Sequence, residues 1–130
     1  MSKILFLYLL LILVSCSTNN HEITYHDNGN IKYDVVYKDN KLDGFAKTYD
    51  ANGNLINKSN YVNNQLHGQW IDYYENGNIQ HIIHYNFNLK DGKEIWYYKS
   101  GNTKSQLIYK DGEIISEMIR WDQEGKIIAE

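Results

Sequence analysis

Histidine and cysteine are the side chains of this chain best suited to bind a metal ion or to act as a nucleophile. The chain has five histidines and one cysteine: His21, His26, His67, His81, His84 and Cys16. His81 and His84 are three residues apart, so on a strand they face opposite sides of a sheet, and the same holds for His21 and His26, which are five apart. His67 falls in an expected turn, where a histidine is ordinarily solvated. We therefore expect neither a metal site nor a cofactor.

The carboxylates lie mostly in short polar segments that recur along the chain, namely Asp27, Asp39, Asp43, Asp91 and Asp111. There they act as turn formers, because an aspartate side chain accepts hydrogen bonds from its own neighbouring backbone. Acid–base catalysis needs carboxylates in unlike environments, whereas recurring turn positions share one environment. No nucleophile elbow surrounds any of the serines. We therefore expect that the protein is not an enzyme.

The N-terminal segment combines one positive charge, Lys3, with an unbroken apolar run over residues 4–14. Eleven helical residues span roughly 17 Å, which is too short to cross a bilayer core of about 30 Å. The run is therefore typical of an export signal. It ends in Leu13-Val14-Ser15-Cys16, a tetrad that resembles the bacterial lipobox, and the single cysteine has no partner for an internal disulfide.

The lipobox resemblance implies that a peptidase removes residues 1–15 and that the thiol of Cys16 carries diacylglycerol. Residues 16–21 would then be the lipidated cysteine and a polar tether, and the protein would be anchored in the bacterial cell envelope. Ser17 stands where an aspartate would favour retention in the inner membrane. By analogy with the enteric sorting rule, this favours the outer membrane of a Gram-negative source.

Three columns of residues recur at an interval of 24 along the chain, and together they indicate a repeat array whose units bury their apolar faces by stacking. One column is Gly29, Gly53, Gly77, Gly101 and Gly125; a second is Tyr37, Tyr61, Tyr85 and Tyr109; a third is Tyr25, Tyr49, Tyr73, Tyr97 and Trp121. Equivalent aromatic residues in stacked units are expected to form a core ladder.

Each unit reads as two strands and two turns. The Asn-Gly pairs at 28–29, 52–53 and 76–77 predict type I′ hairpin turns, and the apolar residues that follow alternate with polar ones, as in a strand with one buried face. We expect an all-β, antiparallel hairpin meander of about four and a half units over residues 22–130, forming one twisted or partly curled sheet. The strands are expected near 22–26, 30–37, 44–50, 54–61, 68–74, 78–86, 92–98, 102–109, 113–122 and 126–129.

The charge of the chain excludes two classes of partner. Removal of residues 1–15 takes away Lys3 from 13 basic residues, which leaves 12 basic against 16 acidic residues. No basic block occurs along the sequence, so nucleic-acid binding lacks its electrostatic component, and so does attraction to anionic lipids.

The repeat motif is similar to the MORN-repeat variant of bacterial proteins. The best copy is residues 66–79 (LHGQWIDYYENGNI), residues 90–101 and 42–53 are further copies, and the last unit, 114–127, is degenerate, as in a capping repeat. The resemblance covers residues 25–128. It implies a β-hairpin array used for interaction or scaffolding, and many bacterial members are labelled antitoxin components.

The candidate binding surface consists of aromatic residues outside the core columns: Tyr74, Tyr98, Trp70 and Trp96. In each neighbouring Tyr-Tyr pair, one ring must point away from the core. The leading hypothesis is a lipid-anchored envelope protein that binds another protein, as yet unidentified, through its repeats. The alternatives are an immunity or antitoxin lipoprotein that neutralises a toxin, and a glycan-binding surface lipoprotein.

Overall fold

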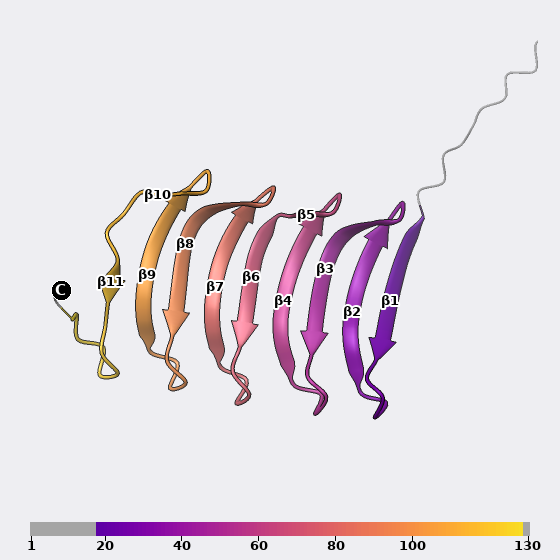
Figure 1. Ribbon diagram of the computed structural model, residues 1–130, viewed down its shortest axis with the longest axis horizontal. Helices are drawn as coiled ribbons and strands as arrows, with labels where there is room; N and C mark the ends of the chain where they lie inside the picture. The colour runs from indigo at the N-terminus through magenta and orange to yellow at the C-terminus, as the bar shows by residue number, and fades with distance from the viewer. Residues whose placement is uncertain (1–17, 129–130) are drawn as a thin grey trace, which may run out of the picture.

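The repeated units assemble into one open antiparallel sheet in a computed structural model that describes residues 18–128 (Figure 1). The order is β1-β2-β3-β4-β6-β7-β8-β9-β10, with β5 paired to β4 and β11 to β9. The strands are β1 (Asn19–Tyr25), β2 (Ile31–Lys38), β3 (Lys41–Tyr49), β4 (Leu55–Val62), β5 (Gln65–Leu66), β6 (Gly68–Tyr73), β7 (Ile79–Asn86), β8 (Leu89–Tyr97), β9 (Thr103–Lys110), β10 (Glu113–Ile114) and β11 (Ile119–Arg120). The predicted all-β meander is confirmed.

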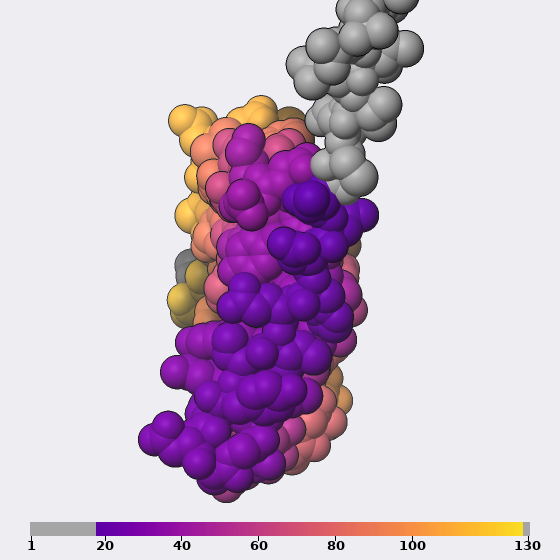
Figure 2. Space-filling view, turned by 90° about the vertical axis from the view of Figure 1, so that its right-hand side faces the viewer, coloured from indigo at the N-terminus to yellow at the C-terminus, as the bar shows by residue number. Residues whose placement is uncertain are grey.

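The sheet is a single layer that extends in one direction from its first strand. In the end-on view of Figure 2, the N-terminal strands lie in front and the later strands lie behind them. Within residues 18–128 there is no helix with the length and hydrophobicity needed to span a bilayer. The predicted signal segment and Cys16 lie outside the described residues.

Cross-strand pairing divides the side chains between two faces, because residues directly opposite each other project from the same side. One row of paired residues, called here the polar row, comprises Thr24, Tyr33, Thr48, Asn57, Asp72, His81, Trp96, Ser105 and Arg120. A second row, the isoleucine row, lies one residue along each strand and therefore on the other face. It comprises Ile23, Asp34, Lys47, Lys58, Ile71, Ile82, Ile95, Gln106 and Ile119.

The buried side chains lie on the face of the polar row. Ile83 is 1% exposed, and Ser59, His81 and Glu94 are buried beside it. The aromatic columns surround this centre as half-buried side chains, except Tyr25 on the edge strand β1, which is 60% exposed. The aromatic columns are therefore half-buried along the sheet, apart from Tyr25, and do not belong to its fully buried centre.

The Asn-Gly turns are not of type I′, so this prediction is wrong. Gly29 N–H donates to the carbonyl of His26 at 2.9 Å, and His26 N–H donates to that of Asn30 at 2.8 Å. Only the glycine has a positive φ, of 88°. This is the pattern of a three-residue hairpin loop, in which a single left-handed glycine follows a turn of ordinary hand.

Type I′ geometry occurs instead at the opposite edge of the sheet. Strands β2 and β3 are joined by Asp39 and Asn40, with φ values of 50° and 61°, and two residues with positive φ are what this turn requires. The same pattern holds at positions 63–64, 87–88 and 111–112. We call this side of the sheet the two-residue-turn edge.

The last unit departs from the expected strands at 113–122 and 126–129. Only β10, β11 and an isolated bridge between Trp121 and Ile127 form there. Earlier units place a glycine with positive φ, such as Gly92 at 114°, where the strand bulges. The last unit has Ser116 instead, whose Oγ accepts the N–H of Ile108 at 2.9 Å. This side-chain bond takes a backbone partner from the ladder, and the strand is interrupted.

The sheet begins earlier than the expected tether allows. Residues 19–21, predicted to belong to a polar tether, lie in β1. Thr18 already exchanges hydrogen bonds with Asp39: its N–H donates to Oδ1 at 3.1 Å, and its carbonyl accepts from the N–H at 3.0 Å. The first strand is thus fixed to the two-residue-turn edge.

Candidate functional site

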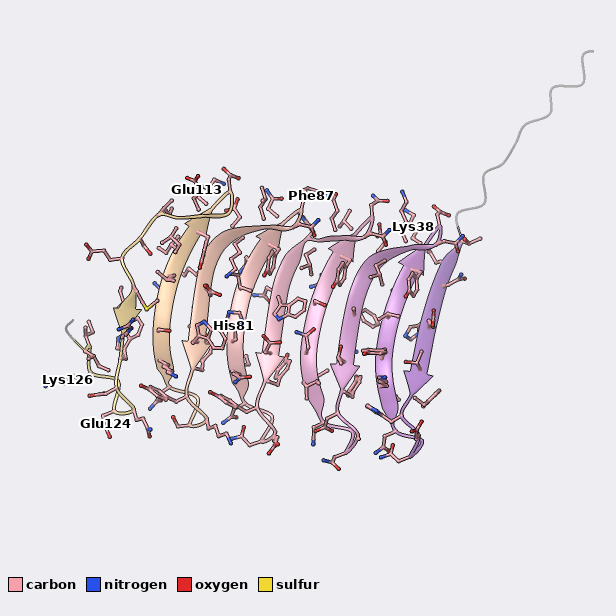
Figure 3. The ribbon with its side chains drawn as sticks, in the orientation of Figure 1. Lys38, His81, Phe87, Glu113, Glu124 and Lys126 are labelled. Carbon is pink, nitrogen blue, oxygen red and sulfur yellow. The ribbon has the colours of Figure 1, made fainter. Side chains whose placement is uncertain are left out.

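His81 occupies the centre of the polar row, between two carboxylates from neighbouring strands. Its Nδ1 lies 3.2 Å from Asp72 Oδ2 on β6, and its Nε2 lies 3.0 Å from Glu94 Oε1 on β8. Figure 3 shows the ring in the middle of the sheet, far from both turn edges. His81 is 7% exposed and Glu94 is also 7% exposed. A buried imidazole therefore links two strands through charged acceptors.

Further donors satisfy the same two carboxylates. The indole Nε1 of Trp70 donates to Asp72 at 2.9 Å, and the side-chain amide of Asn57 donates to Asp72 Oδ1 at 2.7 Å. Lys90 Nζ donates to Glu94 Oε1 at 3.0 Å and lies 4.6 Å from the centroid of the Tyr109 ring. The resulting chain of polar contacts runs from β4 to β9.

The pKa values of the network follow from these contacts. Burial by itself would raise the pKa of Asp72, but hydrogen bonds from His81, Asn57 and Trp70 outweigh it and lower the pKa. Glu94 behaves likewise: burial is opposed by hydrogen bonds from Lys90 and His81, and its pKa is lowered. The pKa of Lys90 is raised, because its bond to Glu94 outweighs burial. In a catalytic pair of an acid and a base, the surroundings push the two pKa values in opposite directions. Here the pKa values of both Asp72 and Glu94 are lowered, so both carboxylates are held in the ionised form.

Trp96 is the exposed residue that this network supports. Its ring stacks on His81 with centroids 4.0 Å apart and an interplanar angle of 21°. The residue is 41% exposed. One side of the indole is thus fixed by a buried ring, which is itself fixed by two carboxylates. Exposed tryptophans on rigid supports are frequent anchors of protein interfaces.

The other three predicted binding residues use their polar groups inside the sheet. The hydroxyl of Tyr74 donates to the carbonyl of Tyr97 at 2.8 Å, and that of Tyr98 donates to the carbonyl of Trp121 at 2.8 Å. Each bond joins one unit to the next. Trp70 is half-buried, and its N–H is held by Asp72 as described above. The register thus places Trp70 on β6 and Trp96 on β8 on the polar-row face, with β7 between them.

The histidines are placed partly as expected. His81 and His84 pair with residues of opposite faces, Trp96 and Gln69, which confirms that they point apart. His67 is not solvated as expected: it is half-buried, its ring centroid lies 4.5 Å from that of Phe87, and its Nδ1 has no hydrogen-bond partner. In the part of the chain that the structure describes, no group of three or more histidine, cysteine or acidic side chains is arranged to hold a metal ion.

Sequence reasoning missed the roles of Asp72, Glu94 and Lys90. One signal was present: the apolar alternation of the strand at 79–85 is interrupted by His81, a polar residue at a position facing the core. Its partners are nine and thirteen residues away in sequence, and only the strand register brings them together.

Comparison with known families identifies the repeats. A family model described as the MORN repeat variant matches residues 19–39, 42–63, 66–86 and 90–111, which is more than half of the chain. No curated protein matches the chain. The matched segments each cover one hairpin of the sheet, so the repeat unit of the family and the structural unit coincide. The chain belongs to the MORN repeat variant family.

Proposed function

We propose that this protein is a lipid-anchored interaction module of the bacterial cell envelope, which binds another protein through the polar-row face and performs no catalysis. MORN repeats are generally modules for interaction with proteins or membranes. The observation that carries the proposal is Trp96, an exposed indole held rigidly by the buried His81 and its carboxylates. Aromatic anchors of low conformational freedom contribute most of the energy of many interfaces.

The start of the sheet supports the anchoring part of the proposal. Residues 1–17 are not described, but β1 begins at Asn19, three residues after Cys16. A lipid on Cys16 would therefore hold the first strand and the two-residue-turn edge close to the bilayer surface. The faces of the sheet would then stand away from the membrane, where a protein partner reaches them.

Mass spectrometry of the N-terminal peptide tests the anchor. In membranes from cells that express the full chain, we expect a peptide that begins at a diacylated Cys16. A Cys16→Ala variant has no thiol to carry the lipid, so the diacylated mature protein should be absent from its membranes. A peptide that still begins at Met1 in the cytosolic fraction would contradict the anchor.

Quantitative affinity capture from solubilised envelopes tests the binding surface. The full chain should enrich a protein partner, and Trp96→Ala should reduce its recovery about tenfold, as for an interface hot spot. Tyr25→Ala is the matched control, because Tyr25 is 60% exposed at the edge of the sheet, away from the polar-row centre. Recovery that is equal in both variants would overturn the assignment of this face.

A second candidate function, glycan binding, is favoured by the same exposed indole, because the apolar face of a sugar ring can pack against the face of an aromatic ring. A glycan array probed with the full chain separates the two functions. Signal that Trp96→Ala abolishes would favour the glycan, whereas an array without signal would end this candidate. The antitoxin alternative has no specific feature of the described residues in its favour.

A further inference from the structure

The face opposite Trp96 carries the isoleucine row, and no other layer covers it in residues 18–128. Three of its isoleucines, Ile71, Ile82 and Ile95, lie directly opposite one another on β6, β7 and β8. All three are half-buried by their neighbours within the sheet. The result is a continuous apolar strip across adjacent strands, of the kind that marks interaction sites when exposed.

Lysines continue this row where the isoleucines end. Lys58 follows Ile71 across the β4–β6 pair, and Lys47 lies directly opposite Lys58 on β3. Lys47 Nζ lies 3.5 Å from Asp34 Oδ2, the one carboxylate of the row. Lys58 has no ion pair or hydrogen bond from its ammonium group within the described chain. Like charges directly opposite on a sheet destabilise it, so the ammonium group of Lys58 does not stabilise this strand pair, although the residue is half-buried.

Strand β8 adds to the positive charge of this face. By the alternation of β8, Lys93 projects from the same side as the isoleucine row, two residues before Ile95. Lys47, Lys58 and Lys93 are far apart in the sequence, so the chain shows no basic block, yet the sheet collects them on one face. A local arrangement of charges that opposes stability is characteristic of a functional site.

The chemistry of the row favours one kind of occupant. A nucleic acid or an anionic polysaccharide would neutralise the lysines, but it would leave the isoleucine strip uncovered. A second copy of this chain offers no match, because Asp72 and Glu94 on its opposite face are already paired with His81 and Lys90. A protein segment with apolar side chains beside carboxylates satisfies both halves of the row.

We propose that the isoleucine row docks a segment of a partner protein in which apolar side chains, placed over Ile82, adjoin carboxylates, placed over Lys47 and Lys58. The inference rests on the proposed role as an interaction module, and it assigns a surface separate from Trp96. A scaffold requires two such surfaces, and the single-layer sheet presents one on each face.

Site-specific photo-crosslinking tests the proposal in cells that express the full chain. A benzophenone amino acid in place of Ile82 should give a protein adduct, and the crosslinked peptide should contain apolar residues next to Asp or Glu. Lys58→Glu should reduce the adduct about tenfold or more, as expected for an interfacial charge pair. Lys126→Glu is the matched control and should leave the adduct unchanged, because Lys126 is exposed and lies at the edge of the sheet that carries the three-residue loops (Figure 3).

Lys58→Glu is expected to weaken binding of the partner but to stabilise the fold. Lys58→Glu replaces the like-charge pair with Lys47 by an opposite-charge pair, so the midpoint of thermal unfolding should rise. Loss of the adduct together with a higher midpoint excludes misfolding as the cause. A lower midpoint would show that Lys58 serves the fold and would overturn the inference.

Other outcomes also decide the matter. An adduct with nucleic acid, polysaccharide or lipid, an adduct insensitive to Lys58→Glu, or no adduct at all would overturn the proposal. Failure of this proposal is distinguishable from failure of the proposed function. If Trp96→Ala abolishes affinity capture while Lys58→Glu changes neither capture nor crosslinking, the polar-row face binds a partner and the isoleucine row does not.

Discussion

Phe87 occupies a turn position that the other units give to Asp39, Asn63 and Asp111. Its φ is 47°, in the left-handed region. Asp and Asn adopt this region readily, whereas a bulky side chain there is an outlier that costs about 1–2 kcal/mol. The ring is 48% exposed and contacts His67. The contact of one half-exposed ring with another offsets only part of the backbone strain.

Phe87→Asn should therefore raise the free energy of unfolding by about 1 kcal/mol, because it relieves the backbone strain of the turn. Urea denaturation of the full chain in detergent measures the change. The reverse exchange, Asn63→Phe in the equivalent turn, provides the matched comparison and should lower stability by a similar amount. If Phe87→Asn proves destabilising, the packing of Phe87 on His67 is worth more than the strain.

Two carboxylates on the polar-row face, those of Asp72 and Glu94, make the stability of the fold depend on pH. The pKa values of Asp72 and Glu94 are lowered from ordinary values of 3.8 and 4.5. A lowered folded pKa contributes stability that is complete above the unfolded value and is lost as pH falls through the folded value. We therefore expect stability to decline below about pH 4.5 and to recover on return to neutral pH.

Glu94→Gln should flatten this decline, because one of the two responsible groups no longer titrates. It should also lower stability at neutral pH by about 1–3 kcal/mol, since Lys90 and His81 lose a charged acceptor. Urea midpoints measured from neutral pH to about pH 3 give both quantities. Glu75→Gln is the control, because Glu75 is exposed in a turn. An unchanged acid slope in Glu94→Gln would contradict the role of Glu94.

At the scale of the elements, side chains in the three-residue loops join successive units. The amides of Asn30, Asn78 and Asn102 donate to backbone carbonyls 21 residues further along, at 2.7–2.8 Å. The second unit breaks this pattern, because the amide of Asn54 turns to Asp50 instead, at 2.9 Å. The tyrosine hydroxyls of the third and fourth units add a second bond of the same kind.

Tyr98→Phe removes the bond to the carbonyl of Trp121 and should cost about 1 kcal/mol, the usual net value of such a bond. The loss should be local, because the bond holds only the interrupted last unit. Hydrogen exchange should accelerate over residues 119–128 and remain unchanged over β2 and β3. Tyr25→Phe is the control, since Tyr25 lies exposed on the first strand. Uniform acceleration along the chain would show that the last unit is not separately stabilised.

The strands were predictable from the sequence because their signals are local. The expected strand at 30–37 and the observed β2 at 31–38 differ by one residue, since alternation and turn residues mark both ends. The turn types were not predictable, because the turns at both edges of the sheet contain Asn, Asp and Gly. Two-residue and three-residue turns differ in loop length, and the loop length depends on which residues of the strands pair. The contact of His81 with Glu94 and the pairing of Lys47 with Lys58 also depend on register, which no column of residues displays.

At the scale of the whole molecule, the single layer leaves one buried centre. Ile83, at 1% exposure, is the one apolar side chain fully buried within residues 18–128, and it lies on β7 in the third unit. Units of a linear array contact only their neighbours, so stability is transmitted from one end to the other through each interface in turn. A defect in the middle should therefore separate the two halves.

Ile83→Ala should lower the free energy of unfolding by about 2–5 kcal/mol, because the side chain leaves a cavity in a site that cannot collapse. Once β7 is loosened, the N-terminal strands β1–β4 and the C-terminal strands β8–β11 should open independently. Hydrogen exchange should then show separate protection levels in the two halves, whereas we expect strands β1–β9 of the native chain to be protected as one cooperative unit. Ile127→Ala, at a position 63% exposed, is the matched control and should leave protection unchanged outside the last turn. If Ile83→Ala still unfolds in one transition at all probes, the strand ladders rather than the buried centre provide the cooperativity of the array.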